Sequence, residues 1–509
     1  MKVLKRDGFA FISLFLFIAF ASSAQAQENQ RPKTDAESSK PAEVEQLKAK
    51  VEQLQTLLEQ QQRAILQLQN RLSEMDGKAR PAALVTAAKA NDADAPSAVA
   101  SQAKQNAAAT EGKSANKESA SAQTKAADKP VAVAGWDAQS AFIRSADGTF
   151  ETRVTGFAQL DFRGYSSGSH PPNTYAVRRA RMRFDGKLGK YYDYRIEGEM
   201  ADTTSILLRD FYLRIARHEA AQLTIGQFRE PFSQEELRPE PSQDFVEKSL
   251  VNLIVPARSP GLMLSGVFNK GTFEYQIGSF NGKGLLRENN TGTPENAVRL
   301  RFAPWKNGKQ FWLKGLAFGG AYAQGKTATV PSFRGQTDSR SFIFFTPDTV
   351  SGKVIRANGE VTWMLGPAAL RAEYDQVNQA RDNLGANGTN LPGLVTKGYM
   401  AQFTYLLTGE TKSENGATTP KRNLFSRENG KPGFGAIEFK ARFDDLEISD
   451  STAKSDRAQT LYLGTNWYLS RYVKYMLDFG FERFKDPLRS PNPADKNYFV
   501  ILSRIQVAF

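Results

Sequence analysis

Short runs of alternating apolar and polar residues fill the chain from about residue 136 to its last residue. One face of the final run is almost wholly apolar and consists of Phe499, Ile501, Ser503, Ile505, Val507 and Phe509. The opposite face carries Arg504 and Gln506. This alternation predicts a strand with lipid on one side and water on the other, although the last strand of a soluble sandwich would show the same pattern. In a barrel, Arg504 would face the lumen close to the first strand.

About 16 such runs follow one another between Trp136 and Phe509, and an even number suits a closed bacterial barrel. Short connections such as Asn269–Gly271 and Gly366–Ala368 alternate with longer polar ones, as expected for tight turns at one rim and loops at the other. The sequence therefore predicts an all-β fold, an antiparallel transmembrane β-barrel over residues 136–509. The connection Gly409–Pro432 is too long for this scheme, and periodicity does not explain it.

One long connection differs from the others in composition. It follows the run that ends at Phe228, extends to about Pro256, and is too apolar for a solvated surface loop. Folded inward it would narrow the lumen; alternatively, it would pack on a neighbouring subunit. Its basic residues Arg229, Arg238 and Lys248 are candidates for a constriction.

The region before the strands has three parts. Residues 1–26 have the organisation of a secretory signal peptide, with basic residues, an apolar run from Phe9 to Ala21 and the cleavage site Ala24-Gln25-Ala26; the apolar run is short for the alternative, a membrane anchor. Residues 41–76 carry apolar residues in steps of three and four, with Gln61 as the one polar core position. This pattern predicts a coiled coil, the alternative being an amphipathic helix packed on a domain. Residues 78–135 have the composition of a flexible linker.

Composition excludes several functions. The chain contains no cysteine and only two histidines, His170 and His218, so thiol chemistry, cysteine or histidine metal sites and most histidine-based catalysis are excluded or disfavoured. We therefore expect no enzyme activity, no metal and no cofactor. The formal net charge is +13, with most of the excess in the strand-rich part. Basic character suits anions, a lipid surface or nucleic acid, but an exported strand-rich chain makes nucleic acid an improbable partner.

Several motifs resemble one family. Tyr175-Ala-Val-Arg-Arg-Ala-Arg-Met-Arg-Phe-Asp-Gly is similar to the second strand of the phosphate-selective porin O and P family, and Gly226-Gln-Phe-Arg-Glu-Pro-Phe-Ser resembles the start of its third loop. Three further stretches follow in the family's order, beginning at Asp210, Leu407 and Gly435. The resemblance covers roughly residues 149–509. In the family, the stretch at Leu407 opens a longer segment, which would account for Gly409–Pro432.

The resemblance implies a homotrimeric outer-membrane porin of 16 strands that passes phosphate or other small anions along lumenal arginines. Arg178 and Arg179 match the Arg-Arg motif. Alternation places Arg179, Arg181 and Arg183 on one strand face, so these three should point inward. Arg178 has the opposite parity and must lie near a rim or a bulge if it faces the lumen. These four arginines are the candidate anion pathway.

Two alternatives remain open from the sequence. The arginines could brace the wall by pairing with nearby carboxylates and select nothing, which would leave a barrel of weak or different selectivity. The barrel could also anchor a tether, in which the coiled coil lies in the periplasm and contacts peptidoglycan. An outer-membrane enzyme is a more distant reading, because neither histidine lies in a convincing catalytic constellation.

Overall fold

The computed structural model describes residues 132–137, 140–165, 172–201, 205–337, 339, 343–345, 348–428, 430–450, 455–485 and 496–509. The predicted signal peptide and coiled coil, and the predicted linker up to residue 131, lie outside these described residues. Within the described ranges, no helix is both long enough and apolar enough to cross a membrane.

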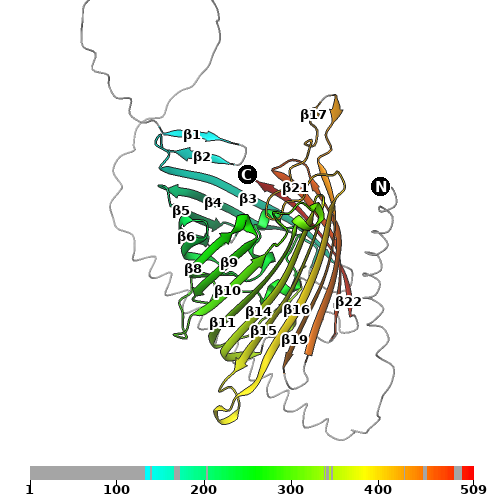
Figure 1. Cartoon of the computed structure of the whole chain (residues 1–509). Coiled ribbons are helices and arrows are strands. Elements are labelled where there is room, and N and C mark those ends of the chain that lie inside the picture. The colour runs from blue at the N-terminus through cyan, green and yellow to red at the C-terminus, as the bar shows by residue number, and fades with distance from the viewer. Residues whose placement is uncertain are drawn as a thin grey trace, which may run out of the picture. The chain divides into compact units, whose positions relative to one another are not determined.

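In the described part of the chain, sixteen antiparallel strands form a closed barrel, because each strand pairs with the next and the last pairs with the first (Figure 1). The strands are β3 (Phe150–Tyr165), β4 (Thr174–Leu188), β5 (Tyr192–Glu199), β6 (Leu207–His218), β7 (Ala221–Arg229), β8 (Arg258–Phe268), β9 (Phe273–Phe280), β10 (Glu295–Phe302), β11 (Leu316–Pro331), β14 (Thr349–Leu365), β15 (Ala368–Arg381), β16 (Leu391–Leu406), β19 (Ala436–Asp450), β20 (Ser455–Tyr468), β21 (Val473–Phe484) and β22 (Asn497–Ala508). The predicted barrel is confirmed.

Alternating burial distinguishes the lumen from the outer wall. On β22, Arg504 and Gln506 are buried inside the barrel, whereas Ile505 and Val507 are exposed on the outside. Successive side chains of a strand point to opposite faces, so this pattern follows directly from the alternation in the sequence. The predicted inward direction of Arg504 is confirmed.

The barrel closes between β22 and β3. Arg504 lies opposite Asp161, with Nε–Oδ1 and Nη2–Oδ2 distances of 2.6 and 2.8 Å. Phe509 exchanges two backbone hydrogen bonds with Gly156, and a Cβ at Gly156 would lie 2.9 Å from both the Arg181 carbonyl oxygen and the Phe509 ring. A buried bidentate pair costs about 3–5 kcal/mol when one partner is removed, so the closure is held by more than its backbone ladder.

A short hairpin precedes the barrel. Its strands β1 (Val133–Trp136) and β2 (Ala141–Arg144) extend the sheet, because β2 pairs with β3 beyond the point where β22 ends. β1 begins within the range predicted as linker. Hydrogen bonds to β2 define this strand. Its sequence has no apolar repeat that would predict it.

The two rims differ in their connections. Tight turns at residues 189–191, 219–220 and 366–367 lie at one rim, called here the turn rim. Most other longer connections lie at the opposite rim, called here the loop rim, but the long connection between β16 and β19 lies at the turn rim. The one-turn helix α4 (Phe311–Lys314) lies just before β11. Two small hairpins lie within connections: β12 (Gly335–Gln336) with β13 (Ile343–Phe345), and β17 (Arg427–Glu428) with β18 (Lys431–Pro432).

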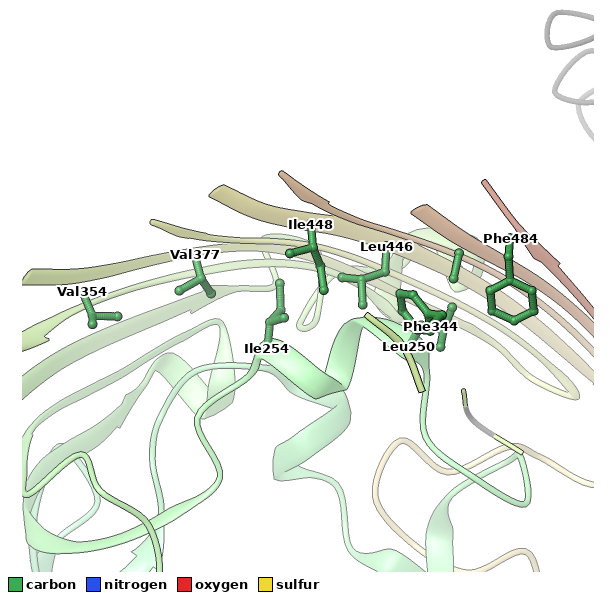
Figure 2. Packing of buried hydrophobic residues seen from close by; sticks show 9 residues of the cluster. Leu250, Ile254, Phe344, Val354, Val377, Leu446, Ile448 and Phe484 are labelled. Atoms are coloured by element: carbon green, nitrogen blue, oxygen red, sulfur yellow. The ribbon is translucent and has the colours of Figure 1, made fainter. Parts of the chain in front are cut away.

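The connection between β7 and β8, residues 230–257, folds into the barrel and is called here the constriction loop. It contains α3 (Gln234–Leu237) and the 3-10 helices η1 (Glu240–Ser242) and η2 (Leu250–Ile254). Leu250 and Ile254 of η2 pack on inward-facing residues of the wall, among them Val377 and Leu446 (Figure 2). Burial of each such side chain contributes about 1.5–3 kcal/mol, which explains the apolar composition of the loop. The predicted inward fold is confirmed.

Candidate functional site in the barrel lumen

The first helix of the constriction loop is attached to the wall through its N-terminus. Ser233 caps α3 by accepting a hydrogen bond from the Glu236 amide. The free amides of the first turn then donate to wall carboxylates, Gln234 N to Glu360 at 3.0 Å and Glu235 N to Glu373 at 2.6 Å. The first amides of a helix have no partner within the helix, so acceptors on the wall fix its position.

The middle of the loop is attached through Asp244. This buried carboxylate pairs with Arg238 of the loop at 3.0 Å, with Arg371 of β15 at 2.9 Å and with Lys412 at 2.6 Å. The Asp244 carbonyl oxygen accepts hydrogen bonds from Lys440 and Asn466. Gln402 of β16 also donates to the Asp244 carboxylate, so one loop residue links four wall strands and the connection that contains Lys412.

A second loop carboxylate, Glu247, lies close to four arginines of β3, β4 and β22. Arg178 lies 2.6 Å from it, Arg163 3.1 Å, Arg504 3.4 Å and Arg179 3.7 Å. Burial by itself would raise the pKa of Glu247, but the positive charges of Arg178, Arg179 and Arg504 outweigh burial and hold this pKa below its usual range. The carboxylate therefore stays charged and keeps these side chains in place.

Two hollows remain in the lumen beside the loop. The turn-side hollow, of 580 Å³, reaches Lys306 and Glu414 in connections at the turn rim. The loop-side hollow, of 460 Å³, reaches Gln336 and Thr337 in the connection between β11 and β14. Six basic and three acidic side chains line the turn-side hollow, and five basic and four acidic ones line the loop-side hollow. Both hollows are therefore net positive.

One layer of ion pairs separates the hollows. Arg229 lines the turn-side hollow, and its guanidinium lies 3.4 Å from Glu236 and 3.5 Å from Glu240, which line the loop-side hollow. Lys248 pairs with both carboxylates. Burial opposes the charge of Glu240, but Arg179 and Lys248 outweigh it, so the pKa of this carboxyl lies well below its usual range. A solute that passes between the hollows must cross this charged layer.

The four predicted arginines of β4 lie in different surroundings. Arg179 and Arg181 line the loop-side hollow, where Arg181 pairs with Glu199 at 2.6 Å and Arg179 lies 3.6 Å from Glu240. Arg178 also lines this hollow, because the register between β3 and β4 shifts there and leaves it as a bulge residue. Arg183 lies outside both hollows and pairs with Asp185 at 2.6 Å.

The three candidates from the third long connection also lie in different surroundings. Arg229 and Lys248 belong to the ion-pair layer between the hollows. Arg238 is buried inside the loop, where it pairs with Asp244 and lines neither hollow. The structure therefore brings five of the seven predicted residues to the hollows and uses Arg183 and Arg238 elsewhere.

The long connection between β16 and β19 also reaches the lumen. Lys412 pairs with Asp244 and Glu438, and Glu414 pairs with Arg301 at 2.9 Å in the turn-side hollow. This part of the connection lies against the lumenal wall, while the β17–β18 hairpin stands at the rim (Figure 1). The length of Gly409–Pro432 thus has a structural reason.

A model of the phosphate-selective porin O and P family matches residues 152–509. The chain belongs to this family. It is a non-enzymatic β-barrel porin of the bacterial outer membrane.

This porin shares little sequence with the similar proteins named next. Porin O of Pseudomonas aeruginosa is 27% identical over 206 residues, which cover 39% of this chain and 43% of that protein. The chain thus matches less than half the length of that relative. OmpT of Vibrio cholerae shares 8% identity with a TM-score of 0.48, over 71% of this chain and 98% of the other. An anion-selective porin from Comamonas acidovorans shares 11% identity with a TM-score of 0.45, over 71% and 100%.

The sequence did not single out several lumenal arginines of this porin, among them Arg209, Arg299 and Arg301. Arg209 lines the loop-side hollow at a second bulge, where the register between β5 and β6 shifts. No ion-pair partner of its guanidinium lies among the described residues, and its Nε atom is buried without a hydrogen bond. The sequence feature that could have indicated Arg209 is the polar pair Arg209-Asp210. It lies between the outward residues Leu208 and Phe211 and interrupts the alternation of apolar and polar residues.

Proposed function

We propose that this porin lets small anions diffuse passively through the outer membrane, with a preference for phosphate or related oxyanions. The observation that carries the proposal is Arg209, an unpaired guanidinium beside Arg179 and Arg181 in a net-positive hollow. A guanidinium without an ion pair is available to a passing anion.

The arrangement supplies a sequence of shallow anion sites. At a constriction, an oxyanion loses part of its hydration, and guanidinium groups replace those waters with charge-assisted hydrogen bonds. An anion would meet Arg178, Arg179, Arg181 and Arg209 in the loop-side hollow, Arg229 in the ion-pair layer, and Arg299 and Arg301 in the turn-side hollow. Glu236 and Glu240 weaken binding in the layer, so that the anion can leave as well as enter.

Replacing both Arg179 and Arg181 by glutamine is expected to weaken block of chloride current by phosphate about tenfold, if each charge contributes about 0.7 kcal/mol to a partly hydrated anion. Planar-bilayer recordings of the wild type should first give reversal potentials that favour anions. A cation-selective wild type would refute the anion proposal. An unchanged block in the double variant would instead assign these two arginines to bracing through Glu199 and Glu240.

We further propose a homotrimer whose contacts lie on the outer wall of β3–β6. Exposed apolar side chains continue on this side to the loop rim, with Tyr175 74%, Val177 59% and Ile206 72% exposed. The two bulges that turn Arg178 and Arg209 inward also keep these residues outward. Contact with a second subunit would cover them.

The double variant Val177→Lys with Ile206→Lys is expected to run as a monomer, because it buries charges in the proposed contact. Native mass spectrometry of the protein in mild detergent measures the number of subunits. Gln376→Lys, on the outer wall of β15, is the matched control and should leave the trimer intact. A trimeric double variant would move the contact elsewhere, and a monomeric wild type would exclude it.

A further inference from the structure

The outer wall of β11–β21 has a boundary marked by tyrosines. On β11 the Tyr322 hydroxyl donates to Gln324 at 2.9 Å, and on β15 the Tyr374 hydroxyl donates to Gln376 at 2.9 Å. Tyr399 of β16 lies directly opposite Tyr374 in the strand register. Aromatic residues of this kind mark the level where the apolar band of a barrel meets the headgroups. The loop rim lies beyond it.

Two lysines face each other beyond this boundary. Lys326 of β11 is the register partner of Lys353 of β14, and both side chains are exposed on the outer face. Neither has an ion-pair partner among the described residues. Like charges directly opposite each other on one face of a sheet repel, and the repulsion is relieved when an anion lies between them.

Basic residues continue around the wall beyond the same boundary. Lys397 lies 3.6 Å from Glu447, whose other register partner is Arg457. Asp445 holds the Arg457 guanidinium at 2.5 Å, and Arg483 is exposed on β21 opposite Gln459. The belt therefore has five basic residues and two acidic ones: Lys326, Lys353, Lys397, Arg457 and Arg483, with Asp445 and Glu447.

The opposite side of the barrel lacks this charge. On β3–β10, the described outward residues nearest the loop rim are apolar or neutral, such as Tyr175, Ile206 and Asn296. Among the described strand residues, the basic belt is thus confined to β11–β21 (Figure 1). A belt that served only solubility would have no reason to occupy one side.

We propose that this basic belt binds the phosphate groups of the phosphorylated glycolipid in the outer leaflet. The loop rim of a bacterial barrel faces outward, so the belt lies at the depth of the outer-leaflet headgroups. Basic residues beside a membrane bind anionic headgroups, and those at the belt can form charge-assisted hydrogen bonds with phosphate oxygens. Lys326 and Lys353 form the central site, and Asp445 orients Arg457 at a second one. The proposal is independent of the selectivity of the lumen.

The test compares binding of bis-phosphorylated and dephosphorylated lipid A to the purified full-length protein in neutral detergent without added divalent cations. The wild type should prefer the phosphorylated form. The Lys326→Gln, Lys353→Gln double variant should lose about thirtyfold in affinity for it, if each lysine contributes about 1 kcal/mol. Lys190→Gln with Lys314→Gln, at the turn rim, is the matched control and should bind as the wild type does.

Three outcomes would overturn the proposal. The double variant could bind phosphorylated lipid A as tightly as the wild type, the wild type could bind dephosphorylated lipid A equally well, or phosphatidylglycerol could compete equally and so indicate a general attraction for anionic lipid. Single-channel conductance of the double variant should equal that of the wild type. This readout shows that the barrel is folded and that the lumen is unchanged.

Discussion

Replacement of Asp244 by asparagine is expected to widen the channel and lower its thermal stability. The amide would keep the shape of the side chain but leave Arg238, Arg371 and Lys412 close together without their shared counter-charge. Removal of one partner from a buried ion pair costs about 3–5 kcal/mol, because the remaining charges stay desolvated. The loop can relieve this penalty by moving away from the wall and out of the lumen, which would widen the channel.

Single-channel recordings and thermal unfolding in detergent measure the two consequences. We expect higher and noisier conductance, together with a lower unfolding temperature. Asp185→Asn is the matched control, because Asp185 pairs with Arg183 and Arg195 on the wall and contacts no residue of the constriction loop through these pairs. A variant that loses stability but keeps the wild-type conductance would show that Asp244 stabilises the barrel without setting its aperture.

Replacement of Arg209 by glutamine is expected to reduce the anion-to-cation permeability ratio by roughly thirtyfold. A unit charge about 8 Å from a passing ion, at an effective dielectric constant of about 40, contributes about 1 kcal/mol. The charge favours anions and disfavours cations. Its loss therefore lowers the anion permeability and raises the cation permeability, and both changes reduce the permeability ratio. Arg209 has this effect because its guanidinium forms no ion pair with a described carboxylate, although Glu236 and Glu240 line the same hollow.

Reversal potentials across a salt gradient give the permeability ratio, and phosphate block of chloride current gives oxyanion binding. Arg209→Lys keeps the charge but loses the fork of donors, so it should restore the ratio while phosphate block stays weak. Arg153→Gln is the control, since Arg153 pairs with Asp137 and Glu151 and lines neither hollow. A wild-type ratio in Arg209→Gln would place Arg209 outside the ion pathway.

Both expectations depend on how the constriction loop divides the wall charges. Glu247 and Glu240 neutralise much of the charge of Arg178 and Arg179, which the sequence placed in the anion pathway. Bracing and selectivity are therefore not exclusive. Arg178 and Arg179 hold the loop in place. Arg209 and the excess positive charge of the turn-side hollow then act on the solute.

The sequence by itself determined the wall of this protein. Side chains of a strand alternate with a period of two, so the apolar faces alone indicated the strands, the closing position of β22 and the inward direction of Arg179, Arg181 and Arg504. Parity also required Arg178 to lie near a rim or at a bulge if it faced the lumen, and the register shift between β3 and β4 occurs there. These features are local, and each can be read within a few residues.

The tertiary structure decided what the wall charges do. Asp244 meets Arg371 and Lys412, which are 127 and 168 residues away in the sequence, and no local pattern couples such distant residues. Cross-strand register likewise decided that Lys326 faces Lys353 and that Arg209 enters the loop-side hollow. The physical reason is the same in each case: an ion pair or a repulsion depends on distance in space, and the closure of the barrel and the path of the loop set that distance.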